Sequence, residues 1–289
     1  MIITRLYNGL GNQLFQYALA RRLSLLHNVA LKLDASQIGI YKIRKYSLKP
    51  FNIIEDFATE DDIVRIKGKG RVNFRSLTER ILPYYKRSYI EEQFFHFDPN
   101  ILSSPKNVYL KGYWQSERYF KDIEDIIRQE FTIKLEPDAI NTQLAEIITN
   151  TNAVSLHVRR GDYVNDTYLN KIYYTCPLDY YREAVEIIAK QTLNPQFFVF
   201  SDDPVWVKKN LIINYKTTYV THNNADKDYE DLRLMSLCRH NIIANSSFSW
   251  WGAWLNRFQE KIIVAPKRWF SSVVNNDTND LIPSSWVRL

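Results

Sequence analysis

The sequence predicts an α/β protein with two Rossmann-like halves. At its start, an apolar strand over residues 2–7 leads through a glycine loop into a helical pattern over residues 14–27, and a second strand follows at 29–34. From residue 153, apolar strands alternate regularly with helical patterns as far as residue 265. Strands that alternate with helices favour parallel sheets covered by helices. We therefore expect two such sheets, with a cleft between the two halves.

The remaining elements follow from apolar runs and from helical spacing of apolar residues. A strand at 107–113 precedes a helix at 119–130, whose early acidic residues suit a helix N-terminus. The later strands are expected at 153–158, 196–200, 217–220, 241–244 and 261–265. The later helices are expected at 141–148, 177–190, 204–210 and 228–238, with a last one that ends at 255.

The division between the halves is expected at the Leu-Glu-Pro-Asp segment, residues 135–138, which has the composition of a linker. It gives an N-terminal domain at residues 1–138 and a C-terminal domain at residues 139–289, whose last residues are free to pack back on the N-terminal domain. A chain of 289 residues is long enough for two domains of ordinary size. Residues 35–107 show no clear period, which indicates short elements and long loops.

The composition is that of a globular protein with an excess of positive charge. Hydrophobic residues make up 45% of the chain, and the formal net charge of +6 is spread along it. A dispersed excess suits an acidic substrate or an anionic membrane surface better than nucleic acid, and no basic-aromatic module is present. Two cysteines, Cys176 and Cys238, form no disulfide framework, and no signal peptide or membrane-spanning stretch is visible. These features predict a cytoplasmic protein and leave open a peripheral association with the inner face of the membrane.

The most informative stretch follows the strand at 153–158. The strand ends in His157-Val158, and Arg159, Arg160, Gly161 and Asp162 come directly after it. Ligands of open α/β sheets bind beyond the carboxyl ends of the strands. A planar guanidinium also matches phosphate oxygens in a bidentate manner. The two arginines therefore indicate an anion clamp, and a salt-bridged strand end is an equally good interpretation of these residues alone.

Two other loops at strand ends can bring donors to a phosphate. The loop G-L-G-N-Q (9–13) exposes backbone N–H groups at a helix start, and it serves equally well as a tight strand-to-helix turn. It lacks the third glycine of the dinucleotide fingerprint. The loop N-S-S-F-S-W-W-G (245–252) places hydroxyl groups at a helix start, where they either donate to phosphate oxygens or cap an aromatic-rich buried helix.

The loop Ser201-Asp202-Asp203 permits two interpretations. Paired carboxylates after a strand can bind a divalent metal. Ser and Asp are also favoured helix caps, and Pro204 suits the first turn, so capping is the better interpretation. Histidines and cysteines show no zinc spacing, and neither a Gly-x-Ser-x-Gly elbow nor a Walker loop is present. No metal site is expected.

Five segments, in this order, resemble glycosyltransferase family 11, the α-1,2-fucosyltransferases. The segments are N-G-L-G-N-Q-L-F-Q-Y-A (8–18), K-G-Y-W-Q-S-E-R-Y-F (111–120), H-V-R-R-G-D-Y (157–163), F-S-D-D-P-V-W (200–206) and N-S-S-F-S-W-W-G-A-W-L (245–255). They span nearly the whole chain and are highly specific together. The H-x-R-R and S-S-F elements are also similar to α-1,6- and protein O-fucosyltransferases. The chain looks like a bacterial member, of the kind that builds O-antigen or host-mimicking glycans.

The resemblance implies a GT-B-like fold, with two Rossmann-like domains facing each other across a cleft. It implies inverting transfer of L-fucose from GDP-β-L-fucose to the 2-hydroxyl of a terminal β-galactoside, without a metal or other cofactor. The domain at 1–138 would face the acceptor, with the 41–51 and 84–97 segments contributing, and the domain at 139–289 would bind GDP-fucose. Partners other than donor and acceptor, nucleic acid in particular, are not expected.

The resemblance also implies residue roles. Arg159 and Arg160 would bind the pyrophosphate and act in catalysis, and Asp162 is the nearest acidic candidate for the catalytic base. The donor-binding residues would be His157 and Asp231 at the guanine, Ser246, Ser247 and Phe248 at the phosphates, and Gly11, Asn12 and Gln13 across the cleft. The acceptor-binding residues would be Tyr113, Trp114 and Gln115. Asp202 and Asp203 would have a structural role.

Two alternatives from other classes remain. One is a metal-dependent glycosyltransferase of another family with Asp202 and Asp203 as ligands, and sensitivity to a chelator would reveal it. The other is a non-catalytic protein that binds a GDP-sugar or a glycan. Such a protein would bind GDP but would release none from donor and acceptor.

Overall fold

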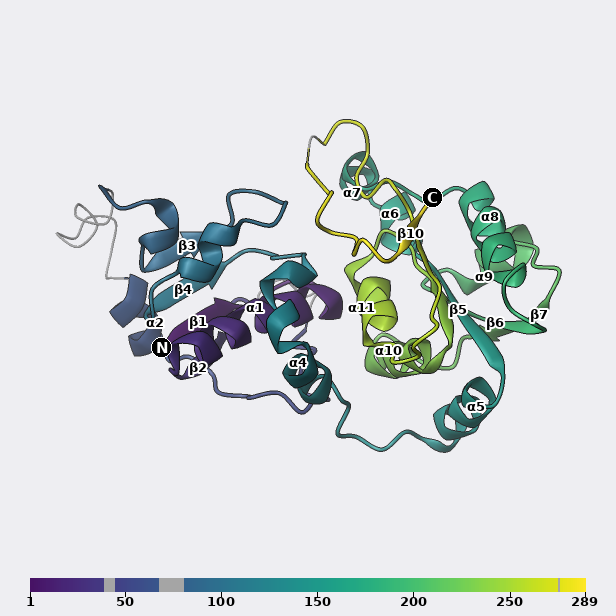
Figure 1. Cartoon of the computed structure of the whole chain (residues 1–289), viewed down its shortest axis with the longest axis horizontal. Helices are drawn as coiled ribbons and strands as arrows, with labels where there is room; N and C mark the ends of the chain where they lie inside the picture. Colours follow the sequence, from purple (N-terminus) through teal and green to yellow (C-terminus); the bar gives the residue numbers. More distant parts are fainter. Residues whose placement is uncertain (39–44, 68–80, 275) are drawn as a thin grey trace. The chain divides into compact units, whose positions relative to one another are not determined.

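Two compact units make up the chain in the computed structural model (Figure 1). The structure describes residues 1–38, 45–67, 81–274 and 276–289. The first unit comprises Met1–Lys134 and Asp277–Leu281, and the second comprises Leu135–Asn276 and Ile282–Leu289. Each unit is built on a parallel sheet, so the predicted α/β fold class is confirmed.

The sheet of the first unit has the strand order β2-β1-β4-β3, and its strand pairs are all parallel. Helix α1 packs on β1 and buries the apolar side of its long helical pattern. The strands are β1 (Ile2–Arg5), β2 (Leu31–Asp34), β3 (Tyr89–Glu91) and β4 (Val108–Lys111). The helices are α1 (Leu10–His27), α2 (Glu60–Lys67), η1 (Tyr84–Lys86), η2 (Pro99–Ser103), η3 (Glu117–Tyr119), η4 (Lys121–Ile123) and α4 (Glu124–Glu130).

Two helices of the first unit differ from expectation. Helix α1 begins one turn before residue 14, because the N–H groups of Asn12 and Gln13 donate to the carbonyl of Gly9 and wind the glycine loop into the first turn. The helix expected at 119–130 is divided into η3, η4 and α4. Phe120 is fully buried and has φ −143°, so the chain leaves the helical conformation where that ring enters the core.

The sheet of the second unit has the strand order β10-β9-β8-β5-β6-β7, again all parallel. Its central strands β5 and β6 are mostly apolar and are buried except at one end residue each, as expected for strands covered on both faces. The strands are β5 (Asn152–Val158), β6 (Pro195–Ser201), β7 (Lys216–Val220), β8 (His240–Ile242), β9 (Ile263–Ala265) and β10 (Val287–Arg288). The helices are α5 (Ala139–Thr149), α6 (Gly161–Asn165), α7 (Thr167–Ile172), α8 (Leu178–Ala189), α9 (Pro204–Asn210), α10 (Asp228–Leu237) and α11 (Ser247–Leu255).

Strand register in the second unit brings the chemically interesting loops to one edge of the sheet. His157 pairs with Phe200 and Val158 with Ser201, so β5 and β6 end side by side. Strand β8 pairs with β5 on the other side and leads into the serine loop. The loops that follow β5, β6 and β8 therefore leave from the carboxyl ends of neighbouring strands, which is where open α/β sheets bind their ligands.

Within the described residues, no helix has both the length and the apolar character needed to cross a membrane.

Candidate active site

Arg159 and Arg160 are held by the two aspartates of the neighbouring loop. Nη1 of Arg159 lies 3.1 Å from Oδ2 of Asp202, and the backbone N–H of Arg160 donates to Oδ1 of the same carboxylate at 2.9 Å. Nε of Arg160 lies 3.6 Å from Oδ2 of Asp203. Each arginine side chain remains about a quarter exposed. The two arginines therefore form a salt-bridged strand end and keep part of each guanidinium at the surface.

Asp203 also caps helix α9, as its sequence context predicts. Its carboxylate accepts from the N–H of Trp206 at 3.2 Å, and Pro204 occupies the first turn. Asp202 is packed against Gly161, where an added Cβ would lie 3.0 Å from Oδ2 of that carboxylate. Among the described residues, no three His, Cys, Asp or Glu side chains are grouped to hold a metal ion. The two carboxylates are thus engaged with the arginines and with a helix N-terminus.

Aromatic rings orient both guanidiniums. The guanidinium carbon of Arg160 lies 3.8 Å from the ring centre of Trp206, and that of Arg159 lies 5.6 Å from the ring centre of Tyr163. A guanidinium on an aromatic face keeps its edge N–H groups available for an anion. Trp206 lies in the quoted F-S-D-D-P-V-W segment, but the sequence gives no sign that this ring carries Arg160.

The arginine loop and the serine loop are connected through buried groups. The hydroxyl of Tyr163 donates to the carbonyl of Asn245 at 3.1 Å. The Asn245 side chain is fully buried, and its Nδ2 donates to the carbonyls of Trp269, at 2.8 Å, and of Tyr174. Asn245 therefore joins the end of β8 to two distant segments. The sequence marks it only as the residue before two serines.

The serine loop presents the N-terminus of α11. Ser246 is the N-cap residue, and its side chain makes no capping hydrogen bond in the helix. The first N–H groups of a helix have no partner within it, and the helix dipole favours an anion there. Ser247 and Phe248 form the first turn. This arrangement can donate to phosphate oxygens.

His157 lies beside that helix start as a buried neutral imidazole. Its side chain is 5% exposed, and its ring centre lies 5.6 Å from that of Phe248. Burial, and then the neighbouring Arg159, lower the pKa of His157 to about 3. No described residue bonds Nδ1 of this ring, although the atom is buried. A buried polar atom without a partner costs about 1–3 kcal/mol, so this nitrogen is suited to a ligand.

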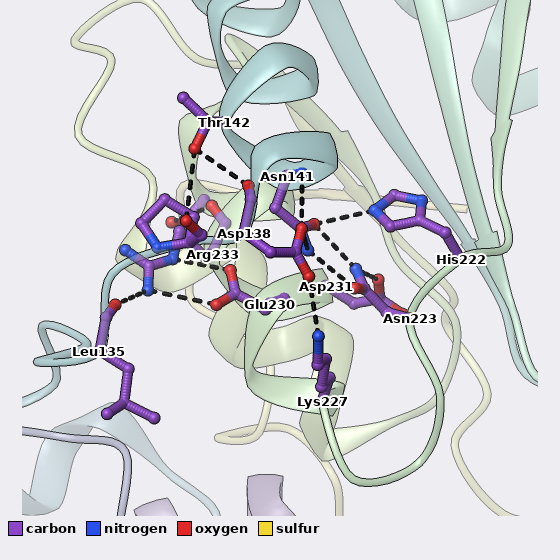
Figure 2. Close-up of polar contacts among 12 residues, drawn as sticks. Leu135, Asp138, Asn141, Thr142, His222, Asn223, Lys227, Glu230, Asp231 and Arg233 are labelled. Carbon is purple, nitrogen blue, oxygen red and sulfur yellow. Dashed lines mark hydrogen bonds and ion pairs between the residues drawn. The ribbon is translucent and has the colours of Figure 1, made fainter.

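Asp231 lies on α10, the helix that packs against α11. Its Oδ1 accepts a hydrogen bond from Nδ2 of Asn223 at 2.8 Å (Figure 2). Burial raises the pKa of Asp231 to about 7, and the Asn223 hydrogen bond acts in the opposite direction. Asp231 is thus a carboxylate on a neighbouring helix, outside the loops that follow β5, β6 and β8.

In the first unit, the side chain of Gln13 is fully buried, and its hydrogen bonds to the described residues all go to backbone groups. Its Nε2 donates to the carbonyls of Asn8 and Lys45, both at 2.8 Å, and its Oε1 accepts from the N–H of Ser47 at 3.0 Å. Gly11 is buried in the first turn of α1. The predicted donor contacts of these residues remain predictions. Their position indicates support of the glycine loop.

Asn12 and the predicted acceptor residues come together in the same unit. Nε2 of Gln115 donates to Oδ1 of Asn12 at 2.6 Å, and Nδ2 of Asn8 donates to the hydroxyl of Tyr113 at 2.7 Å. Hydrogen bonds between side chains therefore join the 8–18 segment to the 111–120 segment. Trp114 and Gln115 are both buried, which leaves Tyr113 as the more accessible residue of this turn.

The side chain of Glu92 supports the turn at Tyr113 and Trp114, a role for which the sequence gives no signal. Its two carboxylate oxygens accept from the N–H groups of Tyr113, at 2.7 Å, and of Trp114, at 2.9 Å. Trp114 has φ 57°, and Gly112 leaves no room for a Cβ, which would lie 2.5 Å from that of Glu92. Burial raises the pKa of Glu92 to about 7, against the effect of the two backbone donors. The carboxylate holds a strained turn in place.

The remaining predicted residues are only partly placed. Asp162 belongs to α6, but its side chain lies outside the described part of the structure. The 41–51 segment is described only from residue 45. The structure therefore brings His157, the two arginines and the α11 N-terminus to one edge of the second sheet, and the asparagines and Gln115 together in the first unit.

Comparison with known proteins identifies the family. The whole chain, residues 1–289, matches the model of glycosyl transferase family 11. The chain belongs to this family. The family 11 chain is 35% identical to an α-1,2-colitosyltransferase of Escherichia coli, over 100% of its own length and 99% of that protein. It is 34% identical to the E. coli O-antigen biosynthesis glycosyltransferase WbnK, over 98% and 99% of the two chains.

A more distant relative has the same kind of sequence, and two solved structures share the fold. A galactoside 2-α-L-fucosyltransferase of Bos taurus is 25% identical over 62% of this chain and 49% of its own. A mutant of Arabidopsis thaliana FUT1 in complex with GDP superposes with a TM-score of 0.53 at 11% identity, covering 91% of this chain and 69% of that one. NodZ α-1,6-fucosyltransferase soaked with GDP-fucose gives 0.52 at 14%, covering 88% and 91%. The family 11 chain is a glycosyltransferase with a GT-B-like fold.

Proposed function

We propose that this glycosyltransferase transfers L-fucose from GDP-β-L-fucose to the 2-hydroxyl of a terminal β-galactoside, with inversion, during synthesis of O-antigen or a related glycan. One observation carries the donor assignment: two guanidiniums, a helix N-terminus without a side-chain cap and an imidazole whose buried Nδ1 no described residue bonds gather at one edge of the second sheet. Such a set of fixed donors matches the oxygens of a sugar-linked diphosphate.

The proposed reaction exchanges one bond at the anomeric carbon for another. The acceptor oxygen attacks C1 of fucose, the bond from C1 to the β-phosphate oxygen breaks, and its electron pair leaves with GDP. Negative charge therefore develops on the β-phosphate, where Arg159, Arg160 and the α11 N-terminus would stabilise it. The acceptor hydroxyl loses its proton late in the reaction, and Asp162 is the proposed carboxylate that takes it.

The guanine base is proposed to bind at Asp231, with His157 as a second contact. Guanine presents two kinds of N–H donor on one edge, and a carboxylate is the natural acceptor for both. Asp231 has one oxygen bonded to Asn223 and is a half-buried carboxylate on the helix next to the serine loop. Ser246, Ser247 and Phe248 would complete the phosphate site.

Catalysis is proposed to need no metal. In metal-dependent glycosyltransferases a carboxylate-bound cation neutralises the leaving diphosphate. Here the candidate carboxylates, Asp202 and Asp203, hold the two arginines instead, so that the guanidiniums would supply the positive charge. Acceptor recognition is proposed for Tyr113, Trp114 and Gln115, with Gly11, Asn12 and Gln13 assigned to the donor as before.

A second donor has a specific observation in its favour. The E. coli relative with 35% identity over the whole chain is named an α-1,2-colitosyltransferase. Colitose is L-fucose without its 3-hydroxyl group, so the same diphosphate and guanine contacts would serve GDP-colitose. Only contacts to that one hydroxyl separate the two donors.

The test is GDP release from GDP-fucose and, separately, from GDP-colitose, with and without a β-galactoside such as lactose or lacto-N-biose, and in the presence of EDTA. We expect release that depends on the acceptor and survives EDTA, with the better donor identified by its higher kcat/KM. Release that EDTA abolishes would restore the metal-dependent alternative. Tight GDP binding without release from any donor-acceptor pair would contradict transferase activity with these substrates.

A further inference from the structure

A polar network surrounds Asp231 and connects three segments of the second unit (Figure 2). Asn141 lies in the first turn of α5, Asn223 lies in the loop before α10, and Asp231 lies on α10 itself. Asn141 is fully buried. These residues lie outside the motifs that suggest the function, and no role is given to Asn223 in the proposed reaction.

The side-chain amide of Asn223 has one fixed orientation. Its Nδ2 donates to Oδ1 of Asp231 at 2.8 Å and to Oδ1 of Asn141 at 3.0 Å, and its Oδ1 accepts from Nδ2 of Asn141 at 2.9 Å. If the amide turned over, its oxygen would face the carboxylate of Asp231. The two asparagines therefore form a reciprocal pair, and Asn223 directs one N–H of that pair at Asp231.

Asn141 is itself held on both sides. Its Nδ2 donates to Oδ1 of Asp138, the N-cap of α5, at 3.0 Å, and its Oδ1 lies 3.0 Å from Nε2 of His222. The amide pair thus rests on a helix N-terminus and on the loop before α10. Because α5 and α10 are packed together, the position of Asn223 is fixed by two helices rather than by its own loop.

The cations of the network are bonded to other carboxylates. Lys227 pairs with Asp138 at 2.8 Å, and Arg233 pairs with Glu230 at 2.9 Å. Asp228 and Glu230 on the same helix raise the pKa of Asp231 after burial does so, and α11, which packs against α10, carries no titratable side chain. A neutral amide is therefore the group that favours the charged form of Asp231, and it does so without cancelling the charge.

We propose that Asn223, fixed by Asn141, is a positioning residue that orients the Asp231 carboxylate and keeps it able to accept N–H donors, and so sets the preference for guanine over a purine that lacks the 2-amino group. This inference rests on the proposed function, in which Asp231 reads the base. Guanine offers the carboxylate N1–H and the 2-amino group, whereas hypoxanthine offers only N1–H. Orientation of the carboxylate then decides whether both donors are satisfied.

The experiment compares GDP and IDP binding to the full chain by isothermal titration calorimetry. Wild type should prefer GDP by about 10-fold or more, as expected for a hydrogen bond to a charged group. Asn223→Ala should reduce this preference to within about 3-fold of unity, while the affinity for IDP changes little. The matched control is Asn150→Ala, which removes an exposed asparagine at the other end of α5 and should keep the preference.

The pH dependence gives a second measurement. Without the Asn223 donor, the pKa of Asp231 rises, so GDP affinity should begin to fall at a higher pH on acidification than in wild type. The nearly isosteric Asn223→Asp variant, which guards against misfolding of the alanine variant, places a second carboxylate against Asp231. Because an ionised carboxylate cannot donate to Asp231, its GDP preference should be lost as well, most completely at a pH where both carboxylates are ionised.

The outcomes separate the inference from the function on which it rests. If Asp231→Asn abolishes the preference but both Asn223 variants keep it, Asn223 is not a positioning residue and the role of Asp231 stands. If Asp231→Asn keeps the preference, the base is read elsewhere and both assignments fail. Equal losses of GDP and IDP affinity in the Asn223 variants would mean a structural role only, and would also overturn the inference.

Discussion

The polar side chains at the carboxyl ends of the two sheets differ in how fully they are hydrogen-bonded. Beyond the second sheet, Arg159 and Arg160 are held by carboxylates yet remain partly exposed, and His157 keeps a buried nitrogen that no described residue bonds. Beyond the first sheet, the amide of Gln13 is bonded to backbone groups, and the amide of Gln115 is bonded to the side chain of Asn12. The second edge thus carries partly exposed guanidiniums and one unbonded imidazole nitrogen, whereas the amides of the first edge are already hydrogen-bonded.

The difference distinguishes a binding edge from a supporting one. A donor that is oriented but not satisfied gains a hydrogen bond when an anion arrives, whereas a satisfied amide must first lose one. We therefore expect substitutions at the second sheet to affect turnover and substitutions at the first sheet to affect stability. Each prediction below can contradict that division.

The largest effect is expected for Arg160→Lys. Lysine has no planar fork to lie on Trp206, whose ring centre is 3.8 Å from the guanidinium carbon, and cannot bind phosphate in a bidentate manner. The kcat for acceptor-dependent GDP release should fall about 100- to 1,000-fold, the usual cost of one transition-state donor. The circular dichroism spectrum should be unchanged, and Arg182→Lys, at an exposed ion pair on α8, should keep full activity. A variant with near-normal turnover would remove Arg160 from the clamp.

Next is Gln13→Leu in the first unit. The substitution leaves the buried N–H of Ser47 and two carbonyls without their partner, so it should lower the free energy of unfolding by about 2–4 kcal/mol. Urea denaturation followed by circular dichroism measures this, with the exposed Gln93→Leu as control. Unchanged stability would show that Gln13 does not support the glycine loop, whatever its effect on donor affinity, and would break the comparison.

A smaller loss of stability is expected for Glu92→Gln. A glutamine can accept from only one of the N–H groups of Tyr113 and Trp114, and its own NH₂ faces the other. The cost should be about 1–3 kcal/mol, concentrated in the turn that holds Trp114 at φ 57°. Hydrogen exchange of those two amides should accelerate more than exchange in the second unit. Equal protection in variant and wild type would show that the turn does not depend on this carboxylate.

The effect that is smallest at neutral pH is a pH dependence of the second unit's stability that arises from His157. The unfolded side chain takes up a proton below its ordinary pKa of about 6.5, but the folded side chain does so only near about 3. Stability should thus be complete above about pH 6.5 and fall on acidification by up to about 1.4 kcal/mol per pH unit. All the tryptophans except Trp114 lie in the second unit, so their fluorescence follows its unfolding in urea.

The variant His157→Leu should flatten this acid limb, whereas His222→Leu, an exposed histidine of the same unit, should retain it. An acid limb in His157→Leu as steep as that of wild type would show that His157 takes up its proton in the folded protein near its ordinary pKa, since a shallower limb remains from His240, whose pKa burial also lowers. The proposed ligand contacts of the second edge would then come from the two guanidiniums and the α11 N-terminus, without this imidazole.

Local features of the sequence were enough to predict the fold class and, at the second edge, the strand and the helix cap that hold the arginine loop. Apolar periodicity and glycine or proline turns act within a few residues, so the strand before His157 and the capping by Asp203 follow from neighbouring residues alone. The same locality explains the errors. Whether the glycine loop winds into α1, or whether Phe120 interrupts a helix, depends on what those residues pack against.

Contacts between distant segments were decided only by the tertiary structure. The bond from the N–H of Arg160 to Asp202 exists because β5 and β6 pair in parallel and end together, and Glu92 meets the N–H of Trp114 because β3 and β4 do the same. Asn223 reaches Asp231 through the packing of α5 on α10. The sequence determines which groups are present and how each segment folds, whereas strand register and burial select which of those groups meet.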